Sequence, residues 1–192
     1  PPRSTLFPYT TLFRSLLDSF LDQDSKPQTK VYFKIYNDDS KNITKIWNKE
    51  KLNQIDCCIT SPPYWNQLKR NNLRQKIRLD NGLDTKYSED ERDIGNIDDY
   101  FSFLKEQEHI FEQVLEIMKP KGHLVIVTNN VYFDGRMYPL AFDTLKSMEK
   151  IGWIPLDEQI WCQNDKSLKP FGIFQKYLGN RSHQYCLIFQ KP

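Results

Sequence analysis

The sequence predicts an α/β fold, because short apolar runs alternate with amphipathic stretches along much of its 192 residues. The clearest helix covers residues 98–118. Its apolar side chains recur at helical spacing: Phe101, Leu104, Phe111, Leu115 and Met118. The turn 119–122 ends this helix and leads into an apolar strand over 123–128. A helix that returns directly into a strand is typical of α/β folds.

A βαβ unit is predicted nearer the amino terminus. Residues 31–36 are β-branched and aromatic, which indicates a strand. An acidic turn over 37–40 follows, and then a short helix over 42–52. Residues 56–60 are a second short apolar run, so the order is strand, turn, helix, strand.

The rest of the chain continues this alternation. The expected elements are a loop over 129–137, a helix over 138–150, a strand over 153–161, a loop over 162–182 and a strand over 185–189. Pro155 places the strand that contains it at an edge or at a strand start. Residues 66–97 are polar throughout, basic first and then mainly acidic, which predicts a mobile charged loop.

Composition sets the limits on function. The net charge is only +2, so any contact with nucleic acid must come from a local patch. Lys69, Arg70 and Arg74 belong to the one basic run and could meet phosphates, or simply be solvated. The four cysteines lack metal-ligand spacing, which favours reduced thiols, a cytoplasmic protein and no metal site. No apolar run approaches the ~20 residues of a membrane span.

The strand over 56–60 ends in a stiff hook, Ser61-Pro62-Pro63-Tyr64. Proline fixes its own φ, cannot donate to a strand ladder and keeps the preceding residue extended. The carboxyl end of a strand is where open α/β sheets bind ligands. Fixed carbonyls, a hydroxyl and an aromatic ring together suit a planar group that carries an amine. A proline-rich turn after a buried strand is the plainer interpretation.

The stretch 56–65, Asp-Cys-Cys-Ile-Thr-Ser-Pro-Pro-Tyr-Trp, resembles the catalytic motif of the amino-group DNA methyltransferases. The turn 119–122 with its following strand, and the strand 185–189, are similar to further segments of that family. The resemblance implies a partial class I, Rossmann-like sheet with helices on both faces. It also implies S-adenosyl-L-methionine as the cofactor and double-stranded DNA with a flipped target base as the substrate.

The resemblance assigns roles to individual residues. Ser61 and Pro62 would accept the protons of the target amine, Pro63 would stiffen the hook, and Tyr64 would stack on the base. The other expected substrate-binding residues are Trp65, Lys69, Arg70 and Arg74. Serine at the first position of the motif favours cytosine N4 over adenine N6.

Two residues are expected to bind the cofactor, Asp39 and Thr60. The turn 37–40 looks like an acidic turn of the family that has lost its glycine. Asp39 could equally be only a helix N-cap. The family's glycine-rich turn is not found, because none of the seven glycines is paired as Gly-x-Gly.

The order of the motifs is that of a permuted branch of the family, with the catalytic half first. We therefore expect residues 31–192 to be the catalytic half of a truncated methyltransferase, without direct pairing of 31–36 with 56–60. Residues 1–15 resemble a translated sequencing adapter, and 16–30 read as a weak helix and linker. A restriction endonuclease partner would fit this function. The alternative is a non-catalytic, methyltransferase-like module that binds DNA or a protein partner.

Overall fold

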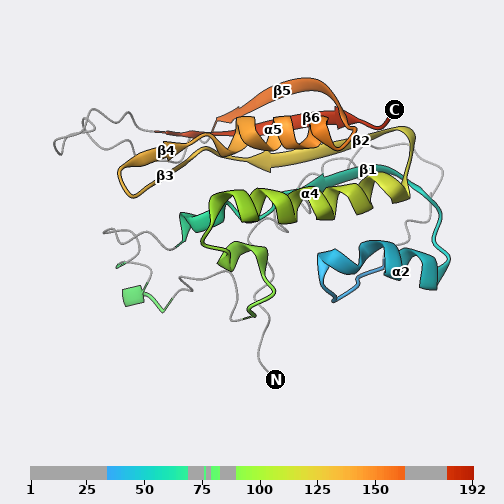
Figure 1. Cartoon of the computed structure of the whole chain (residues 1–192), viewed down its shortest axis with the longest axis horizontal. Coiled ribbons are helices and arrows are strands. Elements are labelled where there is room, and N and C mark those ends of the chain that lie inside the picture. Colours follow the sequence, from blue (N-terminus) through green and yellow to red (C-terminus); the bar gives the residue numbers. More distant parts are fainter. Residues whose placement is uncertain (1–33, 69–75, 77–78, 83–89, 163–180) are drawn as a thin grey trace, which may run out of the picture. The chain divides into compact units, whose positions relative to one another are not determined.

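A computed structural model describes residues 34–68, 76, 79–82, 90–162 and 181–192 (Figure 1). The expected adapter segment and linker, 1–15 and 16–30, lie outside these residues. The chain divides into two units, Pro1–Asn37 and Asp38–Pro192, and the second contains every helix and strand described below.

The predicted strand over 31–36 is wrong for the part that the structure describes. Residues 34–36 adopt neither helix nor strand, and Ile35 is 79% exposed. A strand is stable only when its backbone groups are paired and one of its faces is covered, whatever its β propensity.

A four-stranded mixed sheet forms the centre of the second unit, in the order β1-β2-β6-β5. β1 (Ile55–Thr60) runs parallel to β2 (Met118–Thr128). β6 (His183–Gln190) is antiparallel both to β2 and to β5 (Ile154–Cys162). The predicted α/β class is therefore confirmed, and so are the strands expected near 56–60, 123–128, 153–161 and 185–189.

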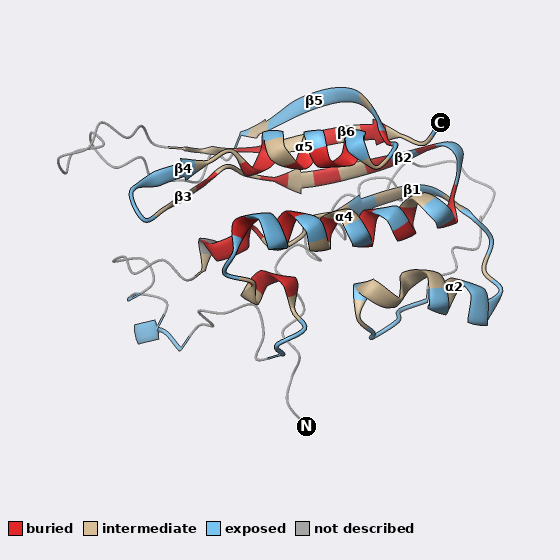
Figure 2. Cartoon of the chain, viewed as in Figure 1, coloured by how far each residue is buried: buried red, intermediate tan, exposed pale blue. Residues whose placement is uncertain are grey.

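The helices α4 (Tyr100–Ile117) and α5 (Leu140–Lys150) share one hydrophobic core with the sheet. Phe111 and Val114 of α4 and Met148 of α5 meet Leu124 and Phe189 of the strands in this core. Figure 2 shows the buried stripe that runs along both helices. Both helices therefore cover the same face of the sheet. The shorter α2 (Ile43–Glu50) packs beside α4.

The turn expected over 119–122 is instead the start of β2, which begins at Met118 directly after α4. Backbone bonds between this stretch and Lys191, from Lys121 N to Lys191 O and from Lys191 N to Gly122 O, extend the pairing beyond β6. Lys121 adopts a positive φ of 61°, and the register with β1 shifts here. The irregular backbone that suggested a turn is therefore a β-bulge within β2.

The loop expected over 129–137 contains a small hairpin. β3 (Val131–Phe133) and β4 (Arg136–Tyr138) are antiparallel, and Asp134 and Gly135 between them both have positive φ. An Asp-Gly pair with positive φ is the preferred two-residue connection of a hairpin. The hairpin follows the carboxyl end of β2 and packs against η2 (Trp65–Gln67), directly after the hook.

Candidate functional site

The hook begins where the parallel pair of strands ends. Thr60 is the last residue of β1 and lies opposite Ile126 of β2. Ser61, Pro62 and Pro63 follow, half-buried and outside any helix or strand. The structure thus places the sequence-predicted motif at the carboxyl edge of a parallel pair, the position at which α/β sheets bind ligands.

Tyr64 closes the hook and is held at its hydroxyl group. The Ser61 Oγ and Tyr64 Oη atoms are 2.9 Å apart, and Gln184 of β6 donates from Nε2 to Tyr64 Oη over 3.1 Å. Only 6% of Tyr64 is exposed. Two residues of the predicted motif are therefore in contact, together with one residue that sequence reasoning had not assigned to the site.

Trp65 has an unusual backbone for a large residue, with a φ of +44°. Its indole packs in an aromatic cluster, with the ring centroid of Tyr138 at 4.4 Å and that of Tyr100 at 5.0 Å. Its Nε1 donates to the carbonyl of Asp98 over 3.1 Å. Such backbone strain costs on the order of 1–3 kcal/mol and persists only where the surroundings fix it. The ring is 3% exposed, so in this state Trp65 supports the hook from the core side.

A hydrogen bond to a carboxylate anchors this cluster. The Tyr100 hydroxyl donates to Asp143 Oδ2 over 2.7 Å. Burial raises the pKa of Tyr100, and the bond to Asp143 adds to the rise. Tyr100 therefore stays a neutral donor, and it ties the start of α4 to α5 behind the hook.

Asp39 is the N-cap of the short helix η1 (Ser40–Asn42), and its Oδ1 accepts from Lys41 N over 2.9 Å. The N-cap interpretation of Asp39 is therefore correct as far as the fold is concerned. The half-buried carboxylate lies before α2, on a different element from the hook.

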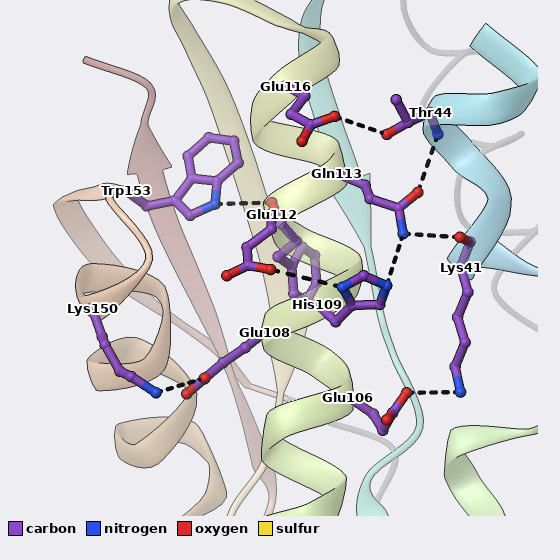
Figure 3. Close-up of polar contacts among 11 residues, drawn as sticks. Lys41, Thr44, Glu106, Glu108, His109, Glu112, Gln113, Glu116, Lys150 and Trp153 are labelled. Atoms are coloured by element: carbon purple, nitrogen blue, oxygen red, sulfur yellow. Dashed lines mark hydrogen bonds and ion pairs between the residues drawn. The ribbon is translucent and has the colours of Figure 1, made fainter. Parts of the chain in front are cut away.

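The helix α4 holds this turn in place through Gln113 (Figure 3). Gln113 Oε1 accepts from Thr44 N at 3.2 Å, and its Nε2 donates to Lys41 O at 2.9 Å. An ion pair between Lys41 and Glu106, 2.7 Å long, lies beside these bonds. The backbone that carries Asp39 is thereby fixed to the same helix that packs behind the hook.

The basic run is not part of the described site. Lys69, Arg70 and Arg74 lie outside the described residues, so their predicted contact with phosphates stays a prediction. The two ends of the 66–97 segment are packed. Asn66 is 3% exposed, and η3 (Ile94–Asn96) buries Ile94 in the aromatic cluster.

Sequence reasoning gave Gln184 no role in the site, although the family resemblance of its strand places it where the family's pattern has an acid. The residue stands 120 positions after Tyr64, and nothing local in the sequence joins them. Within the part of the chain that the structure describes, Gln184 Oε1 has no hydrogen-bond partner although it is buried. The same is true of Asn66 Oδ1, Thr128 Oγ1 and Asn129 Oδ1. The signal available in the sequence was the family's pattern for this strand, in which an acid stands at the position of Gln184.

Within the described residues, no group of three or more His, Cys, Asp or Glu side chains lies close enough together to hold a metal ion. None of the helices in that part of the chain is sufficiently long and apolar to cross a membrane.

Comparison with known proteins gave a family match and structural neighbours. The model of the N6/N4 DNA methylase family matches residues 55–192. No curated protein sequence matches the chain significantly. Among solved structures, the PvuII DNA methyltransferase, cytosine-N4-specific, has a TM-score of 0.54 at 18% identity. The match covers 82% of this chain and 48% of that one.

A second neighbour is a protein of Thermus thermophilus assigned as a DNA modification methylase. Its TM-score is 0.51 at 22% identity, with 80% of this chain and 50% of that chain covered. The chain thus spans about half the length of the solved proteins that it matches. At these identities the neighbours establish the fold, and the mixed sheet with α4 and α5 corresponds to part of theirs.

Proposed function

Because the chain belongs to the N6/N4 DNA methylase family, we propose that the protein transfers a methyl group from S-adenosyl-L-methionine to an exocyclic amine of a base in DNA. One observation carries this proposal. The hook over 61–64 lies at the carboxyl end of β1, stiffened by two prolines and backed by the aromatic cluster around Trp65.

The hook suits an amine because it offers acceptors at fixed positions. An amine of cytosine or adenine carries two hydrogens, and the Ser61 hydroxyl and the Pro62 carbonyl would accept them. Accepting both hydrogens aims the nitrogen lone pair away from the hook, toward the methyl donor. This is positioning and electrostatic stabilisation without a covalent intermediate. The target amine is paired in duplex DNA, so the base has to leave the stack first.

Tyr64 would stack on the flipped base. In this structure its ring is almost fully buried, so a face of the ring has to be uncovered when the base enters. The bonds at the hydroxyl fix one end of the Tyr64 ring. The segments that cover the ring, and not the ring itself, would therefore move when the base enters.

S-adenosyl-L-methionine supplies, when bound, an electrophilic methyl group on a positively charged sulfur. Among the residues of this chain, Asp39 fits the adenosine part, since a half-buried carboxylate can accept from ribose hydroxyls or from the adenine amine. Thr60, the last residue of β1, would lie beside the reacting end. The substrate that we propose is double-stranded DNA, with cytosine N4 favoured by serine at position 61. A restriction endonuclease partner would match such an activity.

The proposal is tested by incubating the full-length protein with duplex DNA and labelled S-adenosyl-L-methionine. Mass spectrometry of the digested DNA then separates N4-methylcytosine from N6-methyladenine. Tyr64→Ala should abolish transfer and leave cofactor binding intact, because the proposed stacking contact is with the base and not with the cofactor. Phe101→Ala, on the 75% exposed Phe101 of α4, is the matched control and should keep full activity. Wild-type turnover in Tyr64→Ala would exclude the stacking role. DNA binding without any transfer would favour the non-catalytic module.

A further inference from the structure

We propose that Gln184 is a positioning residue of the hook, which acts on Ser61 through the hydroxyl of Tyr64. This inference rests on the proposed function and adds a residue to its site. Gln184 lies on β6, outside the hook and at a position where the family's pattern has an acid, and its contact with the hook is a property of the folded chain.

Two hydrogen bonds join Gln184, Tyr64 and Ser61. An amide nitrogen can only donate, so Tyr64 Oη accepts from Gln184 Nε2 at 3.1 Å. The same Tyr64 oxygen is bonded to Ser61 Oγ over 2.9 Å, and either hydroxyl can be the donor of that bond. In both directions Gln184 fixes the position of the Tyr64 hydroxyl, and that hydroxyl fixes the position of Ser61 Oγ. The serine oxygen has two lone pairs, so in either case one remains to accept from the target amine.

The strand β6 holds Gln184 in a fixed position. Gln184 is 5% exposed and lies opposite Trp161 of β5. Tyr185, the next residue, lies opposite Thr128, the last residue of β2. Gln184 thus lies just beyond the end of the β2–β6 pairing, on a backbone held by the central strand of the sheet, so its amide is fixed relative to β1 and the hook.

The contribution of Gln184 to stability does not explain why an amide side chain stands at this position. Within the described residues Gln184 Oε1 is buried without a partner, which is less favourable than a satisfied group. A leucine would fill the same space without that cost. A residue kept at a cost to stability beside a reactive group is best explained by what it does to that group.

The first test needs no catalytic activity. The full-length protein is labelled with 3-fluorotyrosine, and the fluorine resonance that disappears in Tyr64→Phe is assigned to Tyr64. Gln184→Leu should shift or broaden this resonance and leave the other tyrosine resonances in place. Gln190→Leu is the matched control, because Gln190 is on the same strand and bonds only near its far end, to Lys121 O at 3.4 Å and to His123. An unchanged Tyr64 resonance in Gln184→Leu would overturn the proposal.

The second test is a double-mutant cycle on methyl transfer. Gln184→Leu should lower kcat about fivefold to tenfold, the effect of one hydrogen bond, without changing the KM for the cofactor. In the Tyr64→Phe background, Gln184→Leu should cause no further loss, because the hydroxyl through which it acts is gone. If the losses in kcat of the two single variants multiply in the double variant, Gln184 acts elsewhere and the proposal is overturned.

The two tests separate this inference from the proposed function. If the wild-type protein methylates no DNA, the proposed function fails and the fluorine spectra still decide whether Gln184 holds Tyr64. If Ser61→Ala abolishes transfer and Gln184→Leu changes neither kcat nor the Tyr64 resonance, the function stands and the role of Gln184 is excluded.

Discussion

The Lys191 ammonium donates to the carbonyl of Met118 over 2.8 Å, at the point where α4 passes into β2. It makes a second bond of the same length to Leu115 O in the last turn of the helix. The final carbonyls of a helix have no partner within the helix and carry a partial negative charge. One side chain thus satisfies two carbonyls and fixes the junction between the helix and the central strand.

Lys191→Met should therefore lower the free energy of unfolding by roughly 1–3 kcal/mol, because the carbonyls lose a charged donor. Urea unfolding followed by circular dichroism measures this change. Lys146→Met, which alters an exposed lysine of α5, should stay within about 0.5 kcal/mol of the wild type. Equal stabilities of the two variants would show that the bonds of Lys191 contribute nothing measurable.

Gln113 offers a similar test for the turn that carries Asp39. Gln113→Leu keeps the size of the side chain but leaves Thr44 N and Lys41 O without their partner. Amide exchange at Thr44 should become faster, at least tenfold if the loss is about 1.4 kcal/mol, while exchange in the middle of α4 stays unchanged. Glu112→Gln, one position earlier on α4, is the control. Unaltered exchange at Thr44 in Gln113→Leu would mean that other contacts hold the turn.

The thiol of Cys58 should make stability depend on alkaline pH. Burial, with a smaller effect of Cys57, raises the pKa of Cys58 from 9.0 to about 11. The unfolded chain releases this proton at a lower pH than the folded one. The stability contributed by the protonated thiol is therefore fully present below pH 9 and is lost as the pH rises toward 11.

Denaturant unfolding between about pH 8 and pH 11 measures this loss. Cys58→Val, of similar volume, should show a smaller decline over that range than the wild type. Cys162→Val, at an exposed cysteine, should decline as the wild type does. A Cys58→Val curve parallel to that of the wild type would exclude the assigned titration.

The sequence was most informative where apolar residues recur at the spacing of one face of a helix. The apolar residues at helical spacing predicted α4 within two residues of its ends, although one of them, Phe101, is exposed. The hook was predicted for a related reason, because the geometry of consecutive prolines is local and hardly depends on the rest of the fold.

Elements that depend on distant partners were not predicted. Residues 31–36 have the composition of a strand, but the described part of that segment has no strand beside it. The start of β2 at Met118 depends on Lys191, 73 positions away in the sequence. The hairpin of β3 and β4 was missed for a different reason. Asp134-Gly135 between apolar residues is a local hairpin signal, which was present in the sequence and was not used.

The positive φ of Trp65 has a consequence for anyone who redesigns this sequence. A glycine would relax the backbone there, and it would also remove the indole from its place among Tyr100, Phe133 and Tyr138. Removing so large a buried ring typically costs about 3–5 kcal/mol, more than the strain that glycine relieves. No single substitution at position 65 both relieves the backbone strain and keeps the packing of the indole. Any gain in stability has to be sought at the residues around the indole.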